Sequence, residues 1–220
     1  LMAGQKRLLH DVSHEMRSPL ARLQAAIGLA RQQPTRMADS LQRIEREGER
    51  MNLLVGELLT LSRLEAGVTG ALENVDMGEL LAGIVEDARL EGAAQQIDIV
   101  YAPGEMAEIR ANPELLHRAV ENVVRNALRF SAAGGAIYIA AGRVDGEHFK
   151  ISIGDDGPGV PDSQLENIFK PFFRGDAQNT AGGYGLGLAI AQRVIAAVNG
   201  KIQAKNKGSG GLLVEIDLPL

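Results

Sequence analysis

Two histidines and a glutamate near the start of the chain could do chemistry, and they lie within HDVSHEMRSPL, residues 10–20. A neutral imidazole offers a nitrogen lone pair near pH 7, so His14 can attack a phosphorus centre without a strong base. Glu15 can accept the proton of the other ring nitrogen and stabilise the imidazolium that develops. Proline inside a helix costs about 3 kcal/mol and removes a hydrogen bond, so Pro19 predicts a bend shortly after His14.

Two other interpretations of this segment stay open. Most histidines are simply solvated, so His14 taken alone could be a surface side chain in a charged turn. His10 and His14 also lie four residues apart, as the zinc ligands of a His-Glu-x-x-His helix do. Here the glutamate follows the second histidine and the sequence offers no third ligand nearby, which argues against zinc.

A second group of polar residues lies in ENVVRNALRF, residues 121–130. Helical spacing places Asn122 and Asn126 on one face, with Arg125 and Arg129 on a neighbouring face. Amide oxygens suit a hard cation such as Mg²⁺, and guanidinium groups suit phosphate oxygens. For this segment alone, a solvated polar helix face is an equally good interpretation.

Two glycine-containing segments follow. Asp155 ends an apolar strand and precedes the turn 156–159, where a carboxylate could accept a hydrogen bond from an exocyclic amine such as that of adenine. Gly183, Gly185 and Gly187 run into a predicted helix, whose first N–H groups can bind phosphates. Each segment alone is weak support for nucleotide binding, since the first is also typical of an ordinary acidic turn. The spacing is not Gly-x-x-x-x-Gly-Lys-Ser/Thr, which excludes a Walker-type P-loop.

The element that carries His14 is the first of two helices predicted from apolar periodicity. One seam with steps of three or four residues runs over 9–30, and a second runs over 37–58 after a break at 33–35. Two helices with one apolar seam each cannot enclose a core alone. We therefore predict that residues 1–68 form a dimerising helical hairpin, a four-helix bundle in the homodimer.

Residues 73–220 have mixed periodicity and are predicted to form an α/β sandwich, which makes the whole chain α+β. Asn112-Pro113 predicts a helix start, and Asp145-Gly146 predicts a hairpin turn. The glycine-rich stretch 157–187 is long for a connection, which is typical of a functional loop. The predicted helices are 77–94, 112–130 and 187–198, and the predicted strands are 97–101, 135–144, 148–154, 201–205 and 212–218.

Composition narrows the classes of function. The formal net charge of -5 gives no reason to expect nucleic-acid binding, whose proteins usually display a basic face. With no cysteine, a disulfide or thiolate metal site is impossible, and we expect a cytoplasmic chain. No stretch is long and apolar enough to span a membrane, so we expect any anchor in the bacterial inner membrane to lie in a segment upstream.

Taken in order, these segments resemble the sequence boxes of the bacterial histidine kinases: the phospho-acceptor box, then the N, G1, F and G2 boxes. HDVSHEMRSPLARLQ, ENVVRNALRFS, DDGPGVP and IFKPFFR are most similar to the Cpx-type envelope-stress sensor kinases. The resemblance covers nearly the whole chain. It implies a phosphotransfer hairpin joined to a Bergerat-type ATP-binding domain, with ATP and Mg²⁺ as cofactors and a response regulator receiver domain as partner.

The resemblance also implies roles for individual residues. His14 would accept the phosphoryl group from ATP with Glu15 as acid–base partner, and would then pass it to an aspartate of the response regulator. Asn126 would bind Mg²⁺, and Asp155 would bind adenine. Residues 161–182 would form a lid over the nucleotide. The remaining residues implied to bind the nucleotide are Asn122, Arg129, Phe130, Gly157, Gly159, Arg174, Gly183, Gly185, Leu186, Gly187 and Leu188.

Three positions depart from the family pattern. Ser18 stands where threonine or asparagine is usual, which leaves phosphatase activity toward the regulator an open question. Phe130 replaces a tyrosine, and Tyr184 fills a glycine-box position that is usually smaller.

Two rival functions fit parts of the same pattern. One is a related ATPase of the gyrase, Hsp90 or MutL kind, against which the hairpin with His14 argues. The other is a degenerate kinase that acts only as a dimeric scaffold, against which the presence of His14, Asn126 and Asp155 argues.

Overall fold

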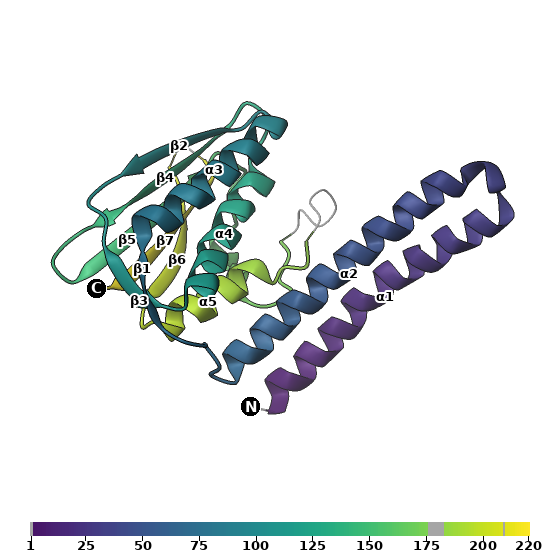
Figure 1. The fold of residues 1–220 in the computed structure, drawn as a ribbon, viewed down its shortest axis with the longest axis horizontal. Coiled ribbons are helices and arrows are strands. Elements are labelled where there is room, and N and C mark those ends of the chain that lie inside the picture. The colour runs from purple at the N-terminus through teal and green to yellow at the C-terminus, as the bar shows by residue number, and fades with distance from the viewer. Residues whose placement is uncertain (1, 176–182, 209) are drawn as a thin grey trace. The chain divides into compact units, whose positions relative to one another are not determined.

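The computed structural model describes residues 2–175, 183–208 and 210–220. By its internal contacts the chain divides into two units, Leu1–Thr60 and Leu61–Leu220 (Figure 1). In the described ranges no helix combines the length and the apolar character that crossing a membrane requires.

The helical hairpin consists of two long helices, α1 (Met2–Gln32) and α2 (Met37–Glu65), joined by the short 3-10 turn η1 (Pro34–Arg36). The first unit holds all of it except the last five residues of α2, 61–65. The two helices run antiparallel, and the predicted helical hairpin is present (Figure 1). α1 stays helical through Pro19. Arg22 on α1 donates from Nε and Nη2 to the two carboxylate oxygens of Glu47 on α2, at 3.0 and 2.9 Å. This paired, charge-assisted contact links the two helices.

The hairpin buries little of its apolar surface within one copy. Among its described side chains the buried apolar ones are Pro19, Ala26, Leu54 and Leu61. Several large apolar side chains are instead exposed by about two fifths or more: Leu20, Met37, Leu41, Leu53, Val55 and Leu59. A surface of this kind is typical of a helix that packs against a further partner.

The second unit contains a five-stranded mixed sheet in the order β2-β4-β5-β7-β6. β2 lies parallel to β4, and the other neighbours are antiparallel. The hairpin predicted around Asp145-Gly146 is present, since β4 pairs with β5 across it. The strands are β2 (Asp98–Pro103), β4 (Ala136–Arg143), β5 (His148–Asp155), β6 (Lys201–Asn206) and β7 (Leu212–Pro219).

Three helices pack on one face of this sheet: α3 (Met77–Gln95), α4 (Pro113–Phe130) and α5 (Gly187–Ala197) (Figure 1). The core lies between the layers, where Leu116, Phe149 and Ile216 are each 0% exposed. Asn112 caps α4 by accepting from the backbone N–H of Leu115 at 2.9 Å, and Pro113 follows, as predicted. The predicted α/β sandwich is confirmed.

Two strands were not predicted. β1 (Glu73–Asp76) and β3 (Glu108–Ala111) pair antiparallel in a small separate sheet. Each strand has four residues; β1 has one buried apolar position and β3 has two. Strands this short do not show a recognisable alternation of apolar and polar residues in the sequence. The connection after β5 holds two 3-10 turns, η2 (Asp162–Gln164) and η3 (Asn167–Phe169).

Candidate functional site

His14 lies on α1 with its side chain exposed, half-buried Glu15 beside it and exposed Ser18 one turn further on. The His10 ring lies edge-on to it, with the ring centroids 4.6 Å apart. Among the described residues no group of three or more histidine, cysteine or acidic side chains is arranged to hold a metal ion. An exposed imidazole on a regular helix is accessible to an incoming reactant, which suits a nucleophile.

The second unit holds the other predicted residues, among them Asp155, the last residue of β5. This side chain is 4% exposed, and its Oδ1 accepts from the backbone N–H groups of Gly157 at 2.8 Å and Leu212 at 3.1 Å. Burial raises the pKa of Asp155 above its usual range, and the two N–H donors act in the opposite direction. The carboxylate is therefore fixed in orientation by backbone donors, as an acceptor for one specific ligand group must be.

The turn after Asp155 packs directly on the end of α4. A Cβ on Gly157 would lie 2.7 Å from the carbonyl oxygen of Phe130 and 2.8 Å from Oδ1 of Asp155. Gly159 has a φ of +71°, a backbone conformation that residues other than glycine rarely adopt. Glycine at position 157 thus lets the segment after Asp155 approach α4 at backbone distance, and glycine at position 159 lets it approach Asn206.

The polar residues of α4 meet the second glycine segment. The Oδ1 of Asn122 is 3.3 Å from where a Cβ of Gly187 would stand, at the start of α5. A Cβ on Gly183 would clash with the guanidinium of Arg129, which in turn lies 5.3 Å from the ring centroid of Phe130. The structure therefore brings together residues more than fifty positions apart that the sequence analysis had grouped only by resemblance.

Asn122 and Asn126 are the two amide side chains of α4 that are predicted to bind the nucleotide and its metal ion. Both are half-buried on α4, one turn apart. The Nδ2 of Asn122 is buried and has no hydrogen-bond partner among the described residues. A buried amide donor without a partner is costly, and a bound acceptor such as a phosphate oxygen would satisfy it.

The remaining predicted residues are placed less directly. Gly185 has a φ of +71° and its carbonyl accepts from the N–H of Phe172 at 2.9 Å, which ties the glycine segment to the segment before exposed Arg174. Leu186 and Leu188 are 0% and 9% exposed, so any nucleotide contact there comes from the backbone. Of the predicted lid, residues 161–182, the part 176–182 lies outside the described residues.

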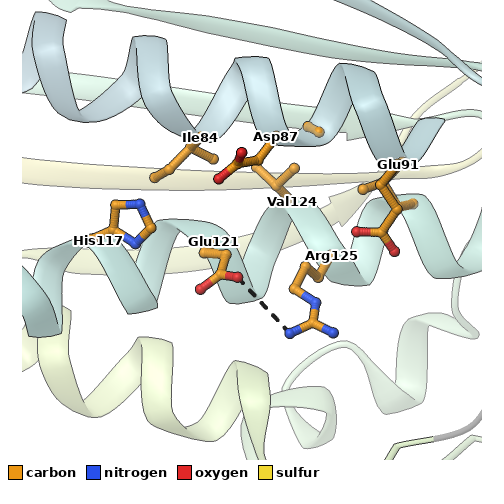
Figure 2. Close-up of a pocket in the computed structure, with 9 residues that line it drawn as sticks. Ile84, Asp87, Glu91, His117, Glu121, Val124 and Arg125 are labelled. Atoms are coloured by element: carbon orange, nitrogen blue, oxygen red, sulfur yellow. Dashed lines mark ion pairs between the residues drawn. The ribbon is translucent and has the colours of Figure 1, made fainter. Parts of the chain in front are cut away.

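Arg125, which the sequence analysis considered beside Arg129, lies in a different place. It pairs with Glu121 at 3.9 Å in a pocket between α3 and α4, which Figure 2 shows. This pocket measures about 30 Å³, which suits one or two waters and not a nucleotide. Its lining residues are Ile84, Asp87, Ala88, Glu91, His117, Glu121, Val124, Arg125 and Leu128.

Two residues at this site escaped the sequence analysis. Lys207 donates to the main-chain oxygen of Asp155, and Asn206 holds the backbone of Val160. Asn206 ends β6 and Lys207 follows it, 46 to 52 positions along the chain from the residues that they contact. No periodicity or local motif indicates such a contact.

Comparison with known proteins agrees with this geometry. Residues 5–67 match the His Kinase A (phospho-acceptor) domain, and residues 111–220 match the histidine kinase-, DNA gyrase B-, and HSP90-like ATPase domain. The sensor histidine kinase CpxA of Escherichia coli (strain K12) is 36% identical over 100% of this chain and 48% of that protein. The chain thus spans about half the length of the curated relatives it matches.

Two solved structures have a similar fold. The mycobacterial sensor histidine kinase MprB is 29% identical with a TM-score of 0.62, covering 67% of this chain and 97% of that chain. The ShkA structure, solved in complex with AMPPNP, is 28% identical with a TM-score of 0.74, covering 97% of this chain and 45% of that chain. The two domains and the Cpx-like identity confirm the resemblance seen in the sequence, and the chain belongs to the sensor histidine kinases.

Proposed function

We propose that this chain uses Mg·ATP to phosphorylate His14 and then passes the phosphoryl group to an aspartate of a response regulator. One observation carries the proposal: the segment after Asp155 and the glycine segment before α5 both lie against α4, which carries Asn122 and Arg129, in a chain whose phospho-acceptor domain exposes His14. The ATPase domain match and the AMPPNP bound to the ShkA relative support ATP as the phosphoryl donor.

Each part of the nucleotide has a residue suited to it. Asp155 accepts from the exocyclic amine of adenine, while Gly157 and Gly159 let the segment after it pack closely on Phe130 and Asn206. Asn122 and Arg129 donate to phosphate oxygens, and Arg174 adds a further positive charge. The backbone N–H groups at the start of α5 contribute to the same task.

A divalent cation fits this donor set through Asn126, whose amide oxygen is a suitable hard ligand. Mg²⁺ bound there would neutralise negative charge on the triphosphate. The unpartnered buried amide of Asn122, one turn away, supports an anionic ligand at this helix.

The chemical step needs little from the protein beyond position and charge. A ring nitrogen of His14 attacks the γ-phosphorus, the bond to the bridging oxygen breaks, and ADP leaves. Glu15 holds the proton on the other ring nitrogen and stabilises the positive charge on the ring. An aspartate oxygen of the response regulator then attacks the same phosphorus, and His14 leaves as neutral imidazole. In the return reaction, Ser18 would orient a water that attacks the regulator's phosphoaspartate.

We also propose a homodimer formed by residues 1–68, with residues 73–220 as the ATP-binding domain. The exposed apolar residues of the hairpin, among them Leu41 and Val55, support the dimer because water contact with such a seam is unfavourable. The relation to CpxA supports a cytoplasmic domain whose full-length protein resides in the inner membrane of a bacterium.

Labelling with γ-³²P ATP tests the proposal. We expect acid-labile, base-stable label on the wild type and on His10→Gln, and none on His14→Gln. His10 is the matched control because it is an exposed histidine one turn away on the same helix.

Two other outcomes point to the rival functions. Phosphate release without protein-bound label would indicate an ATPase of the gyrase, Hsp90 or MutL kind. No ATP binding at all would indicate a scaffold. Equal label on the wild type and His14→Gln would make the acceptor assignment wrong.

A further inference from the structure

The turn between β6 and β7 contacts the Asp155–Asp162 segment at both of its ends. One end is held by Lys207 and the other by Asn206, which are consecutive in the chain. Leu212, at the end of the same turn, donates its N–H to the Asp155 carboxylate at 3.1 Å. Asn206, Lys207 and Leu212 thus contact this segment at both of its ends.

Lys207 fixes the first end. Its Nζ donates to the main-chain oxygen of Asp155 at 2.8 Å and to Oδ1 of Asp156 at 2.7 Å, and lies 5.2 Å from the ring centroid of Tyr138. The other Asp156 oxygen accepts from the N–H of Ala136 at 3.2 Å, at the start of β4. The lysine side chain is only 17% exposed, so these charge-assisted contacts are poorly screened by water.

Asn206 fixes the second end. Its Oδ1 accepts from the N–H of Val160 at 2.9 Å, while its Nδ2 donates to the carbonyl of Val160 at 2.7 Å and to Oδ1 of Asp162 at 2.8 Å. A Cβ on Gly159 would lie 2.8 Å from the same Oδ1, so this approach requires glycine. The amide therefore satisfies both backbone groups of the residue that follows the turn.

We propose that Asn206 and Lys207 are positioning residues for the nucleotide site, which hold the 155–162 segment in its ligand-binding shape before ATP arrives. This rests on the proposed function. Neither contact reaches the Asp155 carboxylate itself, so both residues act through the backbone that carries it. A segment fixed in advance loses less conformational entropy when the ligand binds, which strengthens binding without changing the chemical step.

The same positioning determines which base is accepted. Adenine presents an amine donor where guanine presents a carbonyl oxygen, and a fixed carboxylate attracts the first and repels the second. If Asp155 could turn aside, the penalty against guanine would fall. Loss of Lys207 is therefore expected to weaken ATP binding and also to narrow the preference for ATP over GTP.

The test compares Lys207→Met with Lys207→Arg and with Lys205→Met. Lys205 is the matched control because it is two residues earlier on β6 and pairs with Glu215 at 2.8 Å. Binding of ATP and GTP is measured by displacement of a fluorescent ATP analogue, and KM and kcat come from the initial rate of His14 labelling. A urea unfolding curve for each variant checks that it is folded.

For Lys207→Met we expect the Kd and KM for ATP to rise about tenfold with kcat changed less than about twofold, since binding and not chemistry is affected. The ratio of GTP to ATP affinity should rise as well. Lys207→Arg should restore most of both losses because it keeps the charge, and Lys205→Met should match the wild type. Asn206→Ala removes the contacts with Val160 and Asp162 without removing a charge. It replaces Lys207→Met in the test if that variant does not fold.

The positioning proposal is overturned if Lys207→Met and Asn206→Ala bind both nucleotides as the wild type does while the wild type binds ATP and labels His14. A fall in kcat with unchanged KM would also overturn it. Failure of the wild type to bind ATP would instead overturn the proposed function, and the positioning role with it.

Discussion

The two units of this chain differ in how they bury apolar surface. All eight phenylalanines and tyrosines of the sequence lie after residue 100, in the second unit, and none lies in the hairpin. The second unit closes its core between a sheet and three helices, with Phe149 and Leu116 wholly buried. The hairpin has aliphatic seams whose members, such as Leu41 and Val55, are 51% and 41% exposed.

The second unit buries its apolar core within one copy of the chain, and the hairpin does not. A closed core gains its stability within the chain, so its unfolding should not depend on protein concentration. An aliphatic seam that faces water gains stability only when a partner covers it, so its stability should depend on concentration. We therefore expect the unit that holds the nucleotide residues to be stable by itself, and the unit with His14 to be completed by assembly.

The largest expected effect is in the closed core. Phe149→Ala should lower the free energy of unfolding of the second unit by about 4 kcal/mol, through lost burial and the cavity left behind. All three tyrosines belong to this unit, so their fluorescence during urea unfolding follows it specifically. Val100→Ala, at a position 47% exposed, is the control and should cost less than about 1 kcal/mol.

This result should be the same at low and high protein concentration. A tyrosine transition that moves with concentration would contradict the comparison, because it would mean that the second unit also depends on assembly.

Local signals in the sequence predicted much of this fold. The Asn112 cap and the Asp145-Gly146 turn each depend on neighbours a few residues away, and both are present. The positioning contacts depend instead on strand register: Asp155 meets Leu212 across 57 positions because β5 pairs with β7. Periodicity specifies which face a residue occupies and leaves open which distant residue it faces.

The same limit applies to the hairpin and to the candidate site. Periodicity predicted both long helices, yet nothing in it pairs Arg22 with Glu47, 25 positions apart. At the nucleotide site, resemblance supplied Asp155 and the glycines. It could not supply Lys207, because this contact belongs to the particular turn between β6 and β7 in this chain.

The second expected effect is on assembly. Val55→Asp places a charge on the hairpin seam, and burial of an unpaired charge in a dimer is strongly unfavourable. We expect the dimer Kd to rise about a hundredfold, equivalent to about 2.7 kcal/mol. Sedimentation velocity of the full chain measures it.

Asn52→Asp is the matched control, since it adds the same charge at an exposed position one turn earlier on α2. It should leave the dimer intact. If both variants and the wild type are monomers at micromolar concentration, the proposed dimer is wrong and the hairpin seam has another partner.

The smallest expected effect is on the pH dependence of the hairpin. Glu47 is 7% exposed, and its hydrogen bonds with Arg22 hold the pKa of its carboxyl below the usual value of 4.5. A pKa lowered by folding means that the folded hairpin favours the charged form, so this stabilisation is complete above about pH 4.5 and is lost as the pH falls further. Because Arg22 is 52% exposed, water screens the pair and the contribution should be about 1 kcal/mol.

Amide hydrogen exchange in α1 and α2 measures this contribution in the full chain. Glu47→Gln should speed exchange at neutral pH, and the difference from wild type should shrink as the pH drops below the carboxyl pKa. Glu49→Gln, which removes an exposed carboxylate from the same helix, corrects for the intrinsic effect of pH on exchange. A difference between wild type and Glu47→Gln that stays constant into the acid range would mean that packing, and not the ion pair, aligns the two helices.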